Sequence, residues 1–164
     1  IKKMKKIILA AALFISCFSF SQIKVIETTP IIRLGSIGQN DIFIQTEGNK
    51  YTIFYKNVEK EDSVNLQSFS FKDLNNDYEN LHKIIVDGFL SDPLLDIKLE
   101  LPNEFVWLHY SKELGQTFVQ FMSKNKKSEI TGVTKAFNTD QINKLFEKKL
   151  TKKGDKDEAM SEFK

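Results

Sequence analysis

Apolar and polar side chains alternate along the first half of the chain, a pattern typical of strands with one buried face. Gly48-Asn49 interrupts the alternation and is typical of a tight hairpin turn, because both residues tolerate positive φ. The looser alternation around Pro30 predicts an edge strand or an arm laid over the core. With this edge strand or arm placed first, the predicted strands cover residues 23–34, 41–46, 50–56 and 66–71.

The period then changes from 2 to 3.6, which predicts a helix at about residues 75–87. Asn76 followed by Glu79 is typical of a capping box at the start of this helix. Gly88 is typical of a left-handed residue that ends a helix. The apolar stripe of the helix consists of Tyr78, Leu81, Ile85 and Phe89.

Four more strands are expected after Asp92-Pro93, in an antiparallel meander. The run at 105–110 is apolar on both faces, which indicates a central position in the sheet. Asn138 predicts the start of a second helix, because apolar residues follow it at helical spacing. The four strands are expected at residues 97–101, 105–110, 116–122 and 129–137.

Counted without the N-terminal edge strand or arm, the element order is therefore βββ-α-ββββ-α. Strands in two blocks with widely separated helices predict the α+β class rather than a parallel doubly wound sheet. We expect one antiparallel sheet of about six to eight strands, packed with two helices in two layers.

The start of the chain has the layout of a secretory signal peptide. Met4-Lys5-Lys6 precede an unbroken apolar run, and small residues alternate at its end, with Ser19 and Ser21 before Gln22. The run is shorter than the roughly 20 apolar residues of a spanning helix, so we expect cleavage and no transmembrane segment afterwards.

Cleavage after Ser21 divides the chain into three parts. Residues 1–21 form the leader, of which 1–3 lie upstream of the expected start at Met4. Residues 22–150 are long enough for a single α+β domain with a sizeable core. Residues 151–164 are dense in charge and short of core residues, which predicts a disordered tail.

The leader contains the single cysteine, Cys17, so the mature chain has no thiol for a disulfide or a nucleophile. Phe14-Ile15-Ser16-Cys17 resembles a bacterial lipobox, which implies a lipoprotein anchored at Cys17 as an alternative to ordinary cleavage. The leader's last residues, Phe-Ser-Phe-Ser-Gln, also resemble those of exported proteins of the Bacteroidota. Export to the periplasm or the medium is therefore expected.

Charge argues against nucleic acid as a partner. The chain has 24 Lys and Arg against 22 Asp and Glu, but four of the lysines lie in the leader. The mature chain is therefore slightly acidic and has no basic footprint for a nucleic acid. No phosphate-binding loop, nucleophile elbow or metal-ligand set occurs in the sequence, so we expect no cofactor and no metal.

Phe105, Trp107 and His109 share one face of a predicted strand and are the candidate ligand-binding residues. His109 is a plausible acid or base near neutral pH, or else a hydrogen-bonded histidine near a sheet end. Two helices can cover one face of the sheet, so this aromatic face is either covered by another part of the chain or lines a groove.

The sequence favours a non-catalytic binding or accessory module of the cell envelope, whose partner is an envelope protein or an apolar small molecule. One alternative is a carrier or sensor of an apolar ligand that binds the aromatic face around Trp107. A second alternative is an enzyme whose site is assembled only in three dimensions, from strands that are distant in the sequence.

Overall fold

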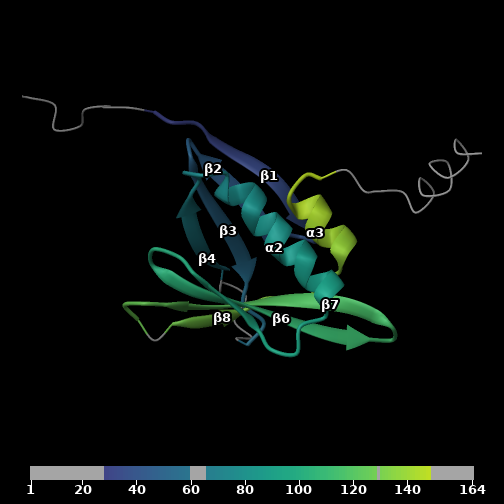
Figure 1. The fold of residues 1–164 in the computed structure, drawn as a ribbon. Coiled ribbons are helices and arrows are strands. Elements are labelled where there is room, and N and C mark those ends of the chain that lie inside the picture. The colour runs from purple at the N-terminus through teal and green to yellow at the C-terminus, as the bar shows by residue number, and fades with distance from the viewer. Residues whose placement is uncertain (1–27, 60–65, 129, 149–164) are drawn as a thin grey trace, which may run out of the picture.

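The computed structural model of the chain describes residues 28–59, 66–128 and 130–148, which form two four-stranded antiparallel sheets and two helices (Figure 1). The predicted leader, 1–21, and the predicted tail, 151–164, lie outside the described residues. Neither of the helices within the described ranges is long and apolar enough to cross a membrane.

The first sheet, sheet A, is a meander in the order β1-β2-β3-β4. The predicted hairpin turn is confirmed: Gly48 has a φ of 59° and Glu47 lies opposite Lys50. The strands of sheet A are β1 (Ile31–Ile37), β2 (Ile42–Glu47), β3 (Lys50–Lys56) and β4 (Leu66–Lys72).

The second sheet, sheet B, is a meander in the order β5-β6-β7-β8. Its two central strands pair over ten residues each around a turn at Leu114-Gly115, where both residues have positive φ. The strands of sheet B are β5 (Ile97–Glu100), β6 (Glu104–Glu113), β7 (Gln116–Asn125) and β8 (Thr131–Val133).

The predicted class, α+β with antiparallel strands and two helices, is confirmed. The strands are divided between two sheets of four, where the sequence suggested one larger sheet. The reason is the connection between β4 and β5: α2 (Asp77–Ser91) separates them, and they do not pair. Two packed sheets bury apolar side chains between them, a common arrangement for this number of strands.

The start of α2 differs from the predicted capping box. Asn76, the residue before the helix, is left-handed, with a φ of 65°, and its side chain makes no capping hydrogen bond. Asp77 instead accepts hydrogen bonds from the backbone N–H groups of Leu74 and Asn75. The chain therefore reaches α2 through a turn stabilised by a carboxylate, and the predicted capping box is wrong.

The end of α2 also lies beyond the predicted glycine. The helix continues to Ser91, and Asp92, with a φ of 45°, is the left-handed residue that ends it. Gly88 lies within the helix, where a Cβ would overlap the side chain of Tyr110. Tyr110 Oη donates to the carbonyl of Ile85, so Gly88 allows α2 to approach β6 closely.

The second helix, α3 (Thr139–Leu145), starts as predicted. Asn138 and Gln141 form a reciprocal capping box, each side chain accepting from the other's backbone N–H. His82 of α2 lies 2.9 Å from Asn143 of α3, measured from Nε2 to Oδ1. Both helices lie on the side of sheet B that also faces sheet A (Figure 1).

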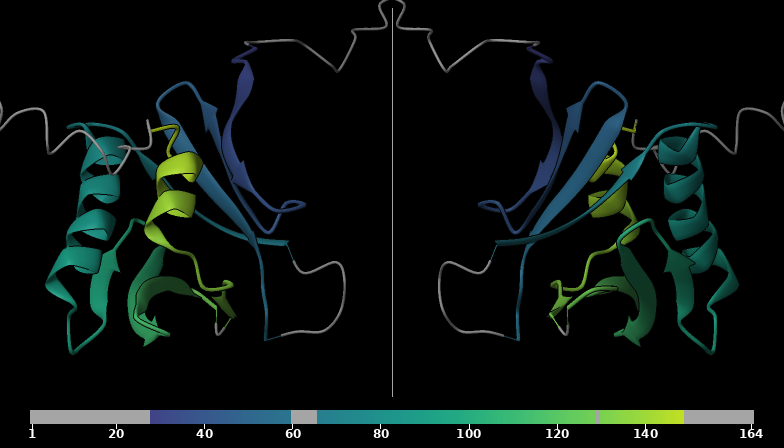
Figure 2. Two further views of the ribbon diagram at one scale, coloured as in Figure 1. Left: turned by 90° about the vertical axis from the view of Figure 1, so that its right-hand side faces the viewer. Right: turned by 90° about the vertical axis from the view of Figure 1, so that its left-hand side faces the viewer.

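Sheet A crosses the strand ends of sheet B, as the two views of Figure 2 show. The Gln67 amide of β4 donates to the carbonyl of Thr131 in β8, and the hydroxyl of Tyr55 in β3 hydrogen-bonds Ser123 in β7. A Cβ at Gly132 would overlap both Gln67 and Tyr55, so glycine allows this contact. Phe69 and Phe121 complete it, with ring centroids 6.3 Å apart.

We expect Tyr55→Phe to lower the free energy of unfolding by about 1–2 kcal/mol, because Ser123 is then left buried without its partner. Urea denaturation measures this change. Tyr51→Phe is the matched control, because the Tyr51 hydroxyl has no hydrogen-bond partner among the described residues, and we expect a change within about 0.5 kcal/mol. Equal losses in the two variants would contradict this account of the junction.

Candidate functional site

The three predicted site residues share one face of β6. Phe105, Trp107 and His109 are all half-buried, and the ring centroids of the first two lie 6.1 Å apart. They point away from the helices, because the alternate residues Val106 and Leu108 are buried in the core. We call this surface the outer face of sheet B. No helix or strand within the described ranges packs against it (Figure 1).

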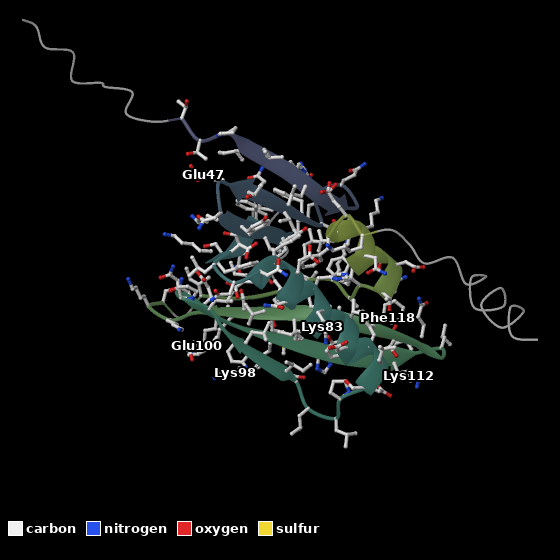
Figure 3. All side chains as sticks on the ribbon, turned by 45° about the horizontal axis from the view of Figure 1, so that its top comes forward. Glu47, Lys83, Lys98, Glu100, Lys112 and Phe118 are labelled. Carbon is white, nitrogen blue, oxygen red and sulfur yellow. The ribbon has the colours of Figure 1, made fainter. Side chains whose placement is uncertain are left out.

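Lysine side chains cover the aromatic rings of the outer face. Lys98 Nζ lies 4.2 Å from the centroid of Phe105 and 5.3 Å from that of Trp107. Lys126 Nζ lies 4.8 Å from the Phe105 centroid and 2.7 Å from a carboxylate oxygen of Glu100. Figure 3 shows Lys98 and Glu100 at one end of sheet B. The rings therefore pack under cations, an arrangement that stabilises an exposed aromatic face.

His109 forms a pair with Asp96, which precedes β5. The Nδ1 to Oδ1 distance is 2.8 Å, and the two side chains are 45% and 35% exposed. Nε2 of His109 has no hydrogen-bond partner among the described residues. The pair supplies an oriented imidazole but no nucleophile hydrogen-bonded to it, so it lacks part of a catalytic constellation.

A groove of about 730 Å³ opens between the two sheets, on the opposite side of β5 from β6, and the sequence did not predict it. The C-terminal end of β4 forms one wall, α2 forms another, and β5 with the following turn forms the third. We call it the β4–α2–β5 groove. Its lining residues are Lys50, Ser70, Phe71, Lys72, Leu74, Asp77, Asn80, Leu81, Ile84, Lys98, Leu99, Glu100, Leu101, Pro102 and Asn103.

The walls of the groove are mainly apolar. Leu81 is buried and Leu99 is half-buried, whereas Leu74 and Ile84 remain 70% and 36% exposed. Asp77 and Glu100 are the acids of the lining, and both are engaged: Asp77 by backbone N–H groups and Glu100 by Lys126. The carboxylates of the groove therefore make contacts within the fold.

Two lysines lie side by side at the β4 end of the groove. Lys50 and Lys72 are direct partners in the β3–β4 ladder. The Asp73 N–H donates to the Asn49 carbonyl over 2.8 Å, so the adjacent pair 50/72 is a non-hydrogen-bonded pair, in which side chains approach most closely. Like charges directly opposite each other are destabilising.

These two cations have no ion pair with any described acid. Glu47 lies opposite Lys50 on the other side, in β2, but the two side chains form no salt bridge. An anionic group bound at the β4 end of the groove would relieve the repulsion between Lys50 and Lys72. The groove thus combines apolar walls with a positively charged end.

A polar pocket of about 140 Å³ lies behind β4, and it contains Glu104. The Oε2 atom of Glu104 is buried without a partner among the described residues. Burial raises the pKa of this carboxyl, while the Ser70 N–H and the nearby Lys126 and Lys50 act in the opposite direction. No group of three or more His, Cys, Asp or Glu suited to a metal occurs in the described part of the chain.

We expect Glu104→Gln to raise the urea midpoint at pH 7. A carboxyl whose pKa is raised by folding binds its proton more tightly in the folded state, so ionisation destabilises the fold as the pH rises through that pKa. The advantage of glutamine should therefore disappear below the unfolded-state pKa of about 4.3. Glu113→Gln, at the exposed end of the same strand, should have no effect at either pH. A lower midpoint for Glu104→Gln at pH 7 would contradict the expectation.

Comparisons of the chain with protein families, curated proteins and solved structures found no match. The β4–α2–β5 groove and the outer face of sheet B are the two candidate binding surfaces of the chain.

Proposed function

We propose that this protein is a non-catalytic binding module of the cell envelope that holds its ligand in the β4–α2–β5 groove. The observation that carries the proposal is the composition of the groove: apolar walls from both sheets and a helix, with two lysines at one end that form no salt bridge to any acid in the described part of the chain. Ligand sites are typically concave, mostly apolar and 300–1,000 Å³ in volume, with a few polar groups that orient the ligand.

Energetics favour an occupant for this groove. Leu74, which precedes α2, and Ile84, in the middle of α2, expose apolar surface to solvent at the groove, and this exposure is unfavourable. The Lys50–Lys72 pair adds repulsion between two like charges that lie opposite each other in the ladder. A ligand with an apolar body and an anionic group would relieve both penalties.

Binding rather than catalysis is supported by the state of the ionisable groups. Asp77 and Glu100, the acids of the groove, are already engaged by the fold. The His109–Asp96 pair lies on the outer face of sheet B, outside the groove lining. The cell-envelope location is part of the proposal, and its support is the leader-like segment at residues 1–21.

An anionic apolar dye, anilinonaphthalene sulfonate, tests the groove as a binding site. We expect Ile84→Glu to weaken dye binding about tenfold or more, because it places a carboxylate on an apolar wall and repels the sulfonate. Leu90→Glu is the matched control: it introduces the same charge on the same helix, at a position that is 82% exposed and outside the groove.

Fluorescence titration measures the dye affinity, and cooperative urea unfolding of each variant excludes dye binding to a partly folded state. Equal affinities for Ile84→Glu and Leu90→Glu would contradict the proposal.

The outer face of sheet B supports a second candidate function, the carriage of an apolar ligand. Trp107, Phe105 and Met122 are neighbours there, with Met122 directly opposite Trp107 in the β6–β7 ladder. A ligand that displaced Lys98 from the rings would contact all three side chains.

Trp107 is the single tryptophan, so its fluorescence reports on this second candidate. If the outer face binds lipid, vesicles of phosphatidylcholine with phosphatidylglycerol should shift its emission to shorter wavelength, and Met122→Glu should abolish the shift. An unchanged emission spectrum with both vesicles and free fatty acid would eliminate this candidate.

A further inference from the structure

The β5 strand has an open backbone edge that faces the groove. It is the outermost strand of sheet B on this side. The Leu101 N–H donates to the Glu104 carbonyl over 2.9 Å, so residues 101, 99 and 97 direct their backbone groups toward β6. By the same alternation, the N–H and C=O groups of Lys98 and Glu100 point away from β6, and both residues line the groove.

Two other sheet edges are closed by the junction between the sheets. At β8, the Asn57 side chain accepts from the Val133 N–H, and the Val58 N–H donates to the Val133 carbonyl. At β4, the Ser70 N–H faces the carboxylate of Glu104. Natural sheets commonly protect their edges in this way.

The charged side chains of β5 do not shield its edge. Charges on an edge strand usually discourage pairing with another chain. Here Lys98 is held over the rings of Phe105 and Trp107, and Glu100 is paired with Lys126. Both side chains are therefore drawn toward the outer face of sheet B, and the backbone of β5 stays accessible from the groove.

From this geometry we infer that the ligand of the groove is an extended polypeptide segment that pairs with β5 as an additional strand of sheet B. The inference rests on the proposed function, because it names the ligand class of the same groove. An acyl chain would bury the free N–H and C=O groups of Lys98 and Glu100 without partners, whereas a peptide backbone pairs with them. The four residues of β5 span about 13 Å, which suits a short strand.

The surroundings of β5 define the sequence pattern of this segment. Side chains on the inner face of an added strand would meet Leu81, Ile84 and Leu74, so they should be apolar. Side chains on its outer face would lie beside Lys98, and one end of the strand would approach Lys50 and Lys72. The partner is therefore a strand that alternates apolar and acidic residues.

A fluorescein-labelled, end-blocked eight-residue peptide of alternating valine and glutamate is the probe, and fluorescence anisotropy measures its affinity. Lys98→Pro removes one N–H that points into the groove, and a proline is tolerated on an edge strand at such a position. Lys98→Ala is the matched control, because it loses the same charge but keeps the N–H. We expect Lys98→Pro to bind the peptide about tenfold more weakly than Lys98→Ala does.

The β1 edge provides the second control. Lys56 N–H donates to the Asp41 carbonyl, and this bond fixes which residues of β2 direct their backbone groups toward β3 and which toward β1. With the β1–β2 register, the N–H of Ile31 therefore points away from β2, on the free edge of β1. Ile31→Pro should leave peptide affinity unchanged. A loss in this variant, or equal affinities for Lys98→Pro and Lys98→Ala, would overturn the inference.

A change on the peptide replaces the proline variant if Lys98→Pro does not fold. Methylation of alternate peptide nitrogens removes the N–H groups on one edge of the bound strand, and we expect one of the two alternating sets to weaken binding about tenfold. Tolerance of both methylated sets would overturn the inference. Dye binding sensitive to Ile84→Glu, without binding of the peptide, would refute the peptide while leaving the binding groove intact.

Discussion

The crossing of β4 over the strand ends of sheet B is the contact on which the rest of the structure depends. The hydrogen bonds of Tyr55 and Gln67 fix sheet A to β7 and β8, and Phe69 and Phe121 bury the space beside them. Because the sheets meet at this junction, both helices can pack against them at once. The same crossing brings the C-terminal end of β4 to β5 and so creates the groove.

The elements of the fold were largely predictable because they depend on local periodicity. The β2–β3 hairpin and the capping box of Asn138 follow from residues that are neighbours in the sequence. The predicted cap at Asn76 failed because Asn76 is left-handed and its side chain makes no capping hydrogen bond, while the Asp77 carboxylate accepts from the turn that precedes the helix. The prediction that Gly88 ends the helix was wrong, because the role of this glycine depends on Tyr110 of β6, which is distant in the sequence.

The candidate site was predictable only where one strand determines it. Alternation correctly placed Phe105, Trp107 and His109 on one face. The lysine above the rings, Lys98, depends on the register between β5 and β6, which the predicted meander does not specify. The groove draws its walls from β4, α2 and β5, so no single period could indicate it. The one sequence signal for the groove is the pair of lysines at its β4 end, Lys50 and Lys72, and this pair can be recognised only when the β3–β4 register is known.

Lys98 contributes to two surfaces at once. Its ammonium group covers Phe105 and Trp107 on the outer face, while its position on β5 places it at the wall of the groove. A ligand that moved this ammonium group would therefore change the free energy of binding at both surfaces. If both surfaces bind ligands, thermodynamic linkage makes the effect reciprocal: occupancy of the groove would alter affinity at the aromatic face by the same factor with which occupancy of that face would alter affinity in the groove.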